Sequence, residues 1–141
     1  MDAVELLRQQ ASTAHEYLEG TMADVTAEQA DWMPPGQAHP IGASYAHAVF
    51  SEDMFVNGLL RGGTPLFAGE WKDKTGQSEL HPQEDWAQYA PWTRNVHLDL
   101  DAARAYAQAV YAATDEYLGE LTADDLDRKL DMSSMGMGET T

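Results

Sequence analysis

The sequence predicts an all-α domain built from long amphipathic helices that pack as a bundle. Apolar residues recur every three or four positions over residues 2–22, 41–60 and 100–121, a spacing typical of helices with one buried face. Capping and stop signals lie at the ends of these ranges. With 141 residues, 43% of them apolar and none of them cysteine, the chain predicts a single domain, residues 1–141, that buries a core without cross-links.

The first part of the chain predicts one long helix and one short one. The long helix covers residues 2–22, and its apolar stripe is Val4, Leu7, Ala11, Ala14, Leu18 and Met22. Thr26 and Gln29 have the spacing of a capping box, which predicts a short helical turn. Pro34 and Pro35 end that turn, because the residue before a proline avoids helical backbone angles.

The second long helix is predicted from Ile41 to Leu60, and the pair Gly62-Gly63 stops it. A longer connection follows, in which residues 64–80 form a loop and Pro82 begins a short helix that reaches Tyr89. Residues 94–98 are predicted to be extended. Asp99 is then a good N-cap for a third long helix, whose stripe is Leu100, Ala103, Ala107, Val110, Thr114, Tyr117 and Leu121.

An internal repeat indicates that a fourth long helix is missing. Residues 122–126 echo residues 26–30, and each segment follows the end of a long amphipathic helix. By this analogy a fourth helix should follow the loop at residues 131–138, but the sequence stops at Thr141. Three helices leave an apolar groove, and such grooves are usually covered. Either the chain is truncated or a partner completes the bundle, so we expect a homodimer rather than a clean monomer.

The charge excludes two classes of partner. Asp and Glu number 24 against 8 Lys and Arg, which gives a formal charge of −16. Such a surface repels phosphate backbones and anionic lipid, so we expect neither nucleic-acid nor membrane binding. The N-terminus has no signal-peptide pattern, and no apolar run approaches the roughly 20 residues of a membrane span. We therefore expect a cytoplasmic protein.

His47 is the main candidate for chemistry. It lies on the predicted helix over residues 41–60, whose two neighbouring stripes are mostly apolar or small, so its imidazole should point inward or into a cleft. It is either packed and hydrogen-bonded or a metal ligand, and one imidazole alone does not hold zinc. Glu52 is a general base, a ligand, an acceptor for an imidazole, or a charge at the helix rim. Asp53 is expected to be solvated.

The other four histidines show no ligand spacing. His15 lies beside the stripe of the first helix, where it is a surface residue or flanks the same interior as His47. His39 and His81 each precede a proline, and His97 comes just before the third long helix. We expect no metal-binding role for these last three. The sequence has no phosphate loop, dinucleotide fingerprint, nucleophile elbow or HExxH motif.

Motifs along the whole chain resemble one family of helical bundles. In order they are Leu6-Leu7-Arg8, Thr26-x-x-Gln29 with Trp32-x-Pro34, Ile41-Gly42-x-Ser44-x-x-His47 with Glu52, Phe67-Ala68-Gly69-x-Trp71-x-x-Lys74-Thr75-Gly76, Tyr106-Ala107-x-Ala109-Val110, Leu121-Thr122-x-x-Asp125-Leu126-Asp127-Arg128 and Gly136-Met137-Gly138-Glu139-Thr140. The chain resembles the DinB-like superfamily of bacterial four-helix bundles, which includes thiol-dependent S-transferases.

The resemblance implies an up-and-down four-helix bundle that binds a divalent metal, zinc or nickel, through three histidines. One of them corresponds to His47, and the other two form a His-x-x-x-His pair on a fourth helix that this sequence lacks. The implied function is a metal-dependent enzyme, a thiol S-transferase or hydrolase, which acts on a small-molecule substrate with a low-molecular-weight thiol. The alternative is a non-catalytic, dimeric helical bundle that binds a ligand or a partner.

Overall fold

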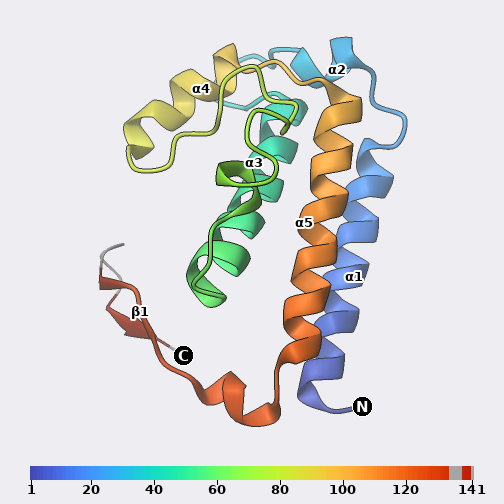
Figure 1. The fold of residues 1–141 in the computed structure, drawn as a ribbon. Coiled ribbons are helices and arrows are strands. Elements are labelled where there is room, and N and C mark those ends of the chain that lie inside the picture. Colours follow the sequence, from blue (N-terminus) through green and yellow to red (C-terminus); the bar gives the residue numbers. More distant parts are fainter. Residues whose placement is uncertain (134–137, 141) are drawn as a thin grey trace.

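The computed structural model describes residues 1–133 and 138–140. Three long helices dominate it: α1 (Ala3–Met22), α3 (Ile41–Asp53) and α5 (Leu100–Glu120) (Figure 1). Two short helices, α2 (Ala27–Asp31) and α4 (Tyr89–Asn95), lie at one end of the bundle. An antiparallel hairpin of β1 (Leu130–Asp131) and β2 (Glu139–Thr140) follows α5, with Leu130 opposite Thr140. The predicted all-α bundle is therefore confirmed.

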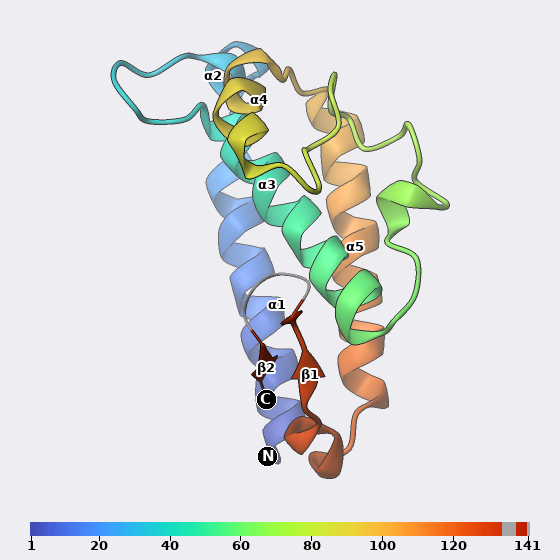
Figure 2. The same ribbon diagram turned by 90° about the vertical axis from the view of Figure 1, so that its left-hand side faces the viewer.

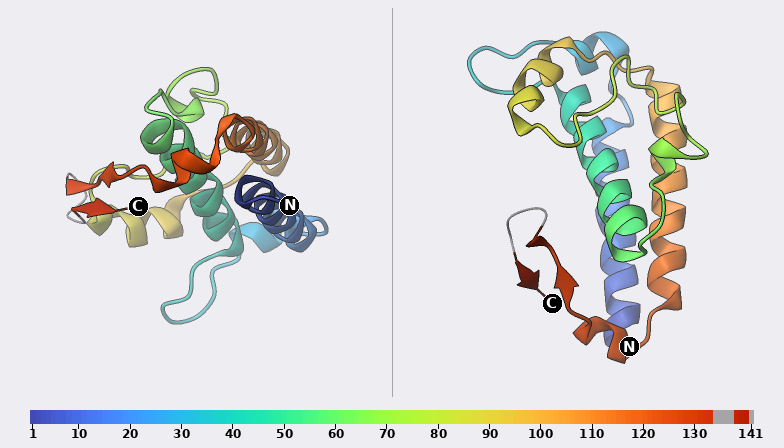
Figure 3. Two further views of the ribbon diagram at one scale, coloured as in Figure 1. Left: turned by 90° about the horizontal axis from the view of Figure 1, so that it is seen from below. Right: turned by 60° about the vertical axis from the view of Figure 1, so that its left-hand side comes forward.

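The directions of the helices follow from the length of the connections. α1 runs up in Figure 1, while α3 and α5 both run down and are parallel to each other. This parallel pair is possible because residues 61–99 carry the chain back along the bundle before α5 begins. α5 packs against both α1 and α3, as the end-on view in Figure 3 shows. The longer connection after the second helix, expected from the sequence, has this function.

Local side-chain caps begin the helices as predicted. The Thr26 hydroxyl accepts from the Gln29 backbone N–H at 3.2 Å, and the Gln29 side chain accepts from the Thr26 N–H at 3.0 Å. Asp99 accepts from the Ala102 N–H at 3.1 Å and caps α5. These bonds use N–H groups that have no partner in the first turn of a helix.

The second long helix continues to Leu60, as predicted, but its last part is π-helical. This segment, η1, covers Met54–Leu60. Near the start of the helix, α2 lies so close that a Cβ at Gly42 would meet the Ala30 carbonyl oxygen at 2.9 Å. Glycine at position 42 thus allows α2 to pack on α3 and fixes the end of the bundle where His47 lies.

The core lies mainly between α3 and α5. Its largest buried apolar side chains include Phe50, Tyr106 and Val110. The predicted stripe of α5 is buried over most of its length, whereas α1 buries only Met22 fully. Leu7 is 39% exposed, so the face that the sequence predicts to be buried on α1 is only partly covered by the described residues.

Two expectations about the second half are wrong. The short helix lies further along the chain than predicted: residues 82–85 are not helical, a 3-10 turn covers Trp86–Gln88, and α4 follows. Residues 94 and 95 consequently belong to α4 and are not extended. The expected loop at residues 131–138 overlaps the hairpin, and Met135 and Met137 lie outside the described residues.

No helix in the described part of the chain is long and apolar enough to cross a membrane.

Candidate functional site

His47 lies on α3 with its imidazole half-buried in the wall of the bundle. Burial lowers its pKa below the usual value for histidine, and the nearby His39 lowers it further. At neutral pH the ring is therefore uncharged and has one nitrogen lone pair. A neutral imidazole is the form that binds a metal.

The structure brings a second histidine to His47, one that the sequence did not single out. Nδ1 of His47 lies 2.7 Å from Nε2 of His81, and the two rings meet edge to edge, with centroids 4.9 Å apart and planes at 23°. On its other side, Nδ1 of His81 lies 2.6 Å from the carbonyl oxygen of Pro82. Because the His81 side chain is buried, its pKa is lowered to about 4 despite this bond. Both imidazoles are thus neutral at pH 7.

His81 is held in the loop before α4 by contacts on several sides. Its backbone N–H donates to the Gln77 side chain at 3.0 Å. Its ring stacks on Phe50 of α3 at 4.3 Å and meets Trp92 of α4 edge-on at 4.6 Å. Trp92 in turn donates to the Glu79 carbonyl at 2.9 Å and ties α4 to the same loop. The position of His81 is therefore fixed by residues from α3, α4 and the loop.

Tyr89 is the centre of a small histidine cluster, which we define as His39, His47, His81 and Tyr89. The Tyr89 ring lies 4.9 Å from His47, 5.3 Å from His39 and 5.7 Å from His81, measured between centroids. His39 is fixed by Thr93, whose hydroxyl lies 3.0 Å from His39 Nδ1. Burial raises the pKa of Tyr89. His39 and His81, for which the sequence predicts no metal-binding role, thus lie beside His47 in the folded chain.

A divalent metal fits this cluster only in part. Imidazole nitrogens suit zinc and nickel, and His47 presents a neutral ring at the partly open wall. Among residues 1–133 and 138–140, however, no group of three or more His, Asp or Glu side chains is placed to hold an ion. The described residues thus provide one or two nitrogen donors, fewer than the three that a zinc site ordinarily takes from the protein.

Glu52 belongs to a different polar group between the three long helices. Its carboxylate contacts His15 Nε2 of α1 at 2.9 Å and accepts a short hydrogen bond from the Thr114 hydroxyl of α5. The His15 ring also stacks on Tyr111, with centroids 3.9 Å apart and planes at 17°. Of the roles considered for Glu52, the structure places it as the acceptor for an imidazole, but that imidazole belongs to His15 and not to His47.

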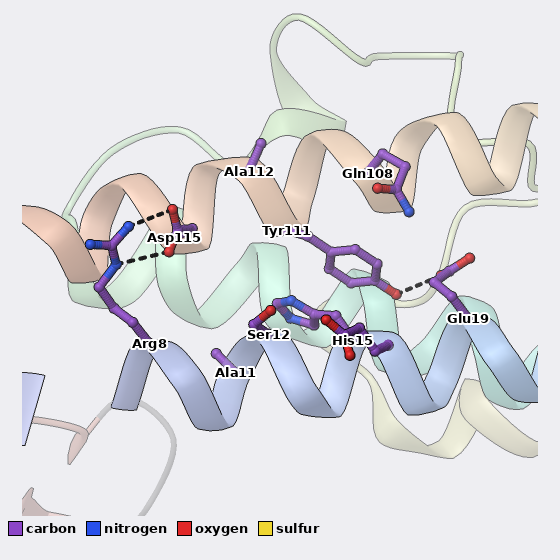
Figure 4. Close-up of a pocket in the computed structure, with 10 residues that line it drawn as sticks. Arg8, Ala11, Ser12, His15, Glu19, Gln108, Tyr111, Ala112 and Asp115 are labelled. Atoms are coloured by element: carbon purple, nitrogen blue, oxygen red, sulfur yellow. Dashed lines mark hydrogen bonds and ion pairs between the residues drawn. The ribbon is translucent and has the colours of Figure 1, made fainter. Parts of the chain in front are cut away.

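A groove of about 520 Å³ runs between α1 and α5 beside His15 (Figure 4). At one end Arg8 and Asp115 form a two-bond ion pair of 2.8 and 2.9 Å. At the other end Glu19 accepts from the hydroxyls of Tyr45 and Tyr111 at 2.8 and 2.9 Å. The bonds of Asp115 and Tyr111 join α5 to α1, and the bond of Tyr45 joins α3 to α1.

Asp53, expected to be solvated, is completely buried. Its Oδ1 accepts from the Asn57 amide at 2.8 Å and the Leu66 N–H at 2.9 Å. Its Oδ2 accepts from the Phe67 N–H at 3.0 Å and the Tyr106 hydroxyl at 2.7 Å. The expectation failed because three of these four donors come from the loop and from α5, and helix periodicity does not reveal contacts with distant segments.

Fold and site together define a helical-bundle protein with a cluster of histidines in its wall. The chain belongs to the DinB superfamily, whose family profile matches residues 10–141. Members of this superfamily generally bind metal. The family resemblance seen in the sequence is confirmed.

A solved structure shows the same fold. It is a crystal structure described as a conserved protein from Enterococcus faecalis, with a TM-score of 0.80 and 23% sequence identity. The match covers 93% of this chain and 78% of that chain. None of the curated proteins compared with the chain matches it.

Proposed function

We propose that this protein is a metal-dependent enzyme that acts on small molecules, as a thiol S-transferase or a hydrolase, and that His47 is one ligand of a zinc or nickel ion. One observation carries the proposal: a neutral, half-buried imidazole on α3 is hydrogen-bonded to a second imidazole in a chain of the DinB superfamily. A second copy of the chain would supply the remaining ligands.

The chemistry follows from an open coordination site. When bound, a divalent ion acts as a Lewis acid that lowers the pKa of a coordinated thiol or water. The low-molecular-weight thiol is the proposed second substrate, because the chain has no cysteine of its own. Tyr89 lies against His47, and Phe50 and Trp92 lie against His81, so aromatic rings form one side of the proposed site.

The first test is metal content. The full natural chain is loaded with Zn²⁺ or Ni²⁺, desalted and measured by inductively coupled plasma mass spectrometry. We expect about one ion per chain in the wild type and a loss of at least tenfold in His47→Ala. His97→Ala is the matched control, because His97 is 69% exposed and pairs with Asp31. Equal metal in the wild type and His47→Ala overturns the assignment.

The second test is thiol transfer. The loaded protein is mixed with glutathione and an aryl chloride, and formation of the thioether is followed by absorbance. Activity that requires both the metal and His47 supports the S-transferase, while hydrolysis of ester or amide probes under the same dependence supports the hydrolase. A metal-loaded wild type that does neither with a broad panel of electrophiles refutes the enzymatic proposal.

A specific observation favours a second candidate, a non-catalytic bundle that dimerises and binds a ligand or a partner. Large apolar side chains of α1 are exposed in the described chain: Leu6 is 44%, Leu7 39% and Tyr17 75% exposed. A second copy would cover this surface. Light scattering across a concentration series distinguishes a monomer from a dimer. A dimer that dissociates more readily in Tyr17→Glu supports this interface, whereas a monomer at all concentrations excludes it.

A further inference from the structure

A chain of hydrogen bonds fixes where the protons of the two imidazoles lie. The Pro82 carbonyl can only accept, so the 2.6 Å contact places a proton on Nδ1 of His81. A neutral ring then has its lone pair on Nε2. Since His47 Nδ1 lies 2.7 Å from that nitrogen, His47 must donate from Nδ1. The free lone pair of His47 is consequently on Nε2.

The short distance between the rings also excludes joint coordination by these two nitrogens. Two nitrogens bound to one tetrahedral zinc at about 2.0–2.1 Å lie roughly 3.3–3.4 Å apart. The 2.7 Å between His47 Nδ1 and His81 Nε2 is instead a hydrogen-bond distance. Joint coordination would require one of the two rings to shift, and His81 is held by Phe50 and Trp92, which lie against its ring.

We propose that His81 is the positioning residue of His47: it accepts the Nδ1 proton, holds the ring in one tautomer and leaves the lone pair of Nε2 free for a ligand. The inference rests on the proposed metal-dependent function only for the role of Nε2. Metal-binding histidines generally donate their other N–H to a carboxylate, a carbonyl or water. Here a second histidine, itself oriented by Pro82, takes that place.

His81 suits the role because it is held more rigidly than a water molecule that accepted the same hydrogen bond would be. Its exposure is 3%, and both its backbone N–H and its Nδ1 are bonded to neighbours in the same loop. A fixed acceptor holds the orientation of the His47 ring before any ligand arrives. Loss of such an outer acceptor typically weakens metal binding 10–100-fold.

The test begins with the metal-free protein. Two-bond ¹H–¹⁵N spectra of the imidazoles report which nitrogen of His47 carries the proton. We expect Nδ1–H in the wild type and loss of that preference in His81→Phe, whose ring fills the space between Phe50 and Trp92 but has no acceptor. A wild-type His47 protonated on Nε2 overturns the proposal whatever the protein does with metal.

Zinc affinity is the second readout, measured by competition with a chromogenic chelator. We expect a 10–100-fold weaker affinity in His81→Phe and recovery to within about threefold in His81→Gln, because the glutamine oxygen reaches the place of Nε2. Circular dichroism confirms that each variant is folded, and His97→Phe is the exposed control. Wild-type affinity in His81→Phe overturns the positioning role. A wild type that binds no zinc but has the Nδ1–H tautomer refutes the proposed function and supports the tautomer assignment.

Discussion

Replacing Asp53 by alanine should destabilise this fold more than an ordinary core truncation. The carboxylate is the common acceptor of four donors, which join α3, the loop at residues 66–67 and α5. In Asp53→Ala the Asn57 amide, the Tyr106 hydroxyl and two backbone N–H groups lose their partner inside the protein. Each buried donor left unpaired costs about 1–3 kcal/mol.

The expected magnitude follows from how many of these donors water can reach. If water satisfies half of them, the loss of unfolding free energy is about 3 kcal/mol, and if it satisfies none, the loss exceeds about 5 kcal/mol. Asp53→Asn should cost less, because its oxygen still accepts on the Oδ1 side while its NH₂ faces the Phe67 N–H. Tyr106→Phe removes one donor only and should cost about 1–2 kcal/mol.

Urea denaturation, followed by circular dichroism, measures all three variants. The reasoning requires the order Tyr106→Phe, Asp53→Asn, Asp53→Ala in increasing cost, with similar slopes against urea. A loss of unfolding free energy below about 1 kcal/mol in Asp53→Ala would refute the conclusion that the carboxylate holds α3, the loop and α5 together. The pH should stay near 7, because at lower pH the protonation of other groups would also change the free energy of unfolding.

Other perturbations probe the remaining parts of the fold. The pKa of the His81 side chain is about 4 in the folded chain and 6.5 in the unfolded chain. Between pH 4 and pH 6.5 only the unfolded chain therefore binds this proton. The unfolding free energy of the metal-free protein should thus decline by about 3 kcal/mol as pH falls from about 6.5 to 4, and His81→Gln should flatten this decline in pH-dependent urea titrations. Gly76→Ala should lower the free energy of unfolding by about 2–4 kcal/mol in the same assay, since φ is +76° and a Cβ would lie 2.5 Å from an α5 backbone nitrogen. Gly36 has the same φ but open space around it, so Gly36→Ala should cost only about 1 kcal/mol. Glu52→Ala should cost about 1–3 kcal/mol, and adding Thr114→Val should recover part of it; strictly additive losses would contradict their hydrogen bond.

The features that the sequence predicted well are local in the chain. The capping box at Thr26 and Gln29 and the N-cap at Asp99 depend on residues three positions apart, so spacing alone identifies them. The stripe of α5 is equally local, because helix periodicity places its residues on one face. The all-α class follows from the same signals.

The features that the sequence did not predict depend on contacts between distant segments. His81 is separated from His47 by 34 positions and lies in a loop, where no periodicity applies. Its one local signal was the proline that follows, and the bond that matters there is made by the carbonyl of Pro82. Glu52 was correctly considered as an acceptor for an imidazole, yet its partner on α1 emerges only when the helices pack.

The pairing of α1 with α5 sets an order of events when the chain is made. Arg8 and Asp115 are 107 positions apart in the sequence, and they join the first helix to the last of the three long ones. At synthesis rates of about 5–20 residues per second, α1 waits roughly 5–20 seconds on the ribosome before its partner helix exists. Alanine at positions 11 and 14 keeps the apolar stripe of α1 narrow, so the helix exposes less apolar surface during that interval.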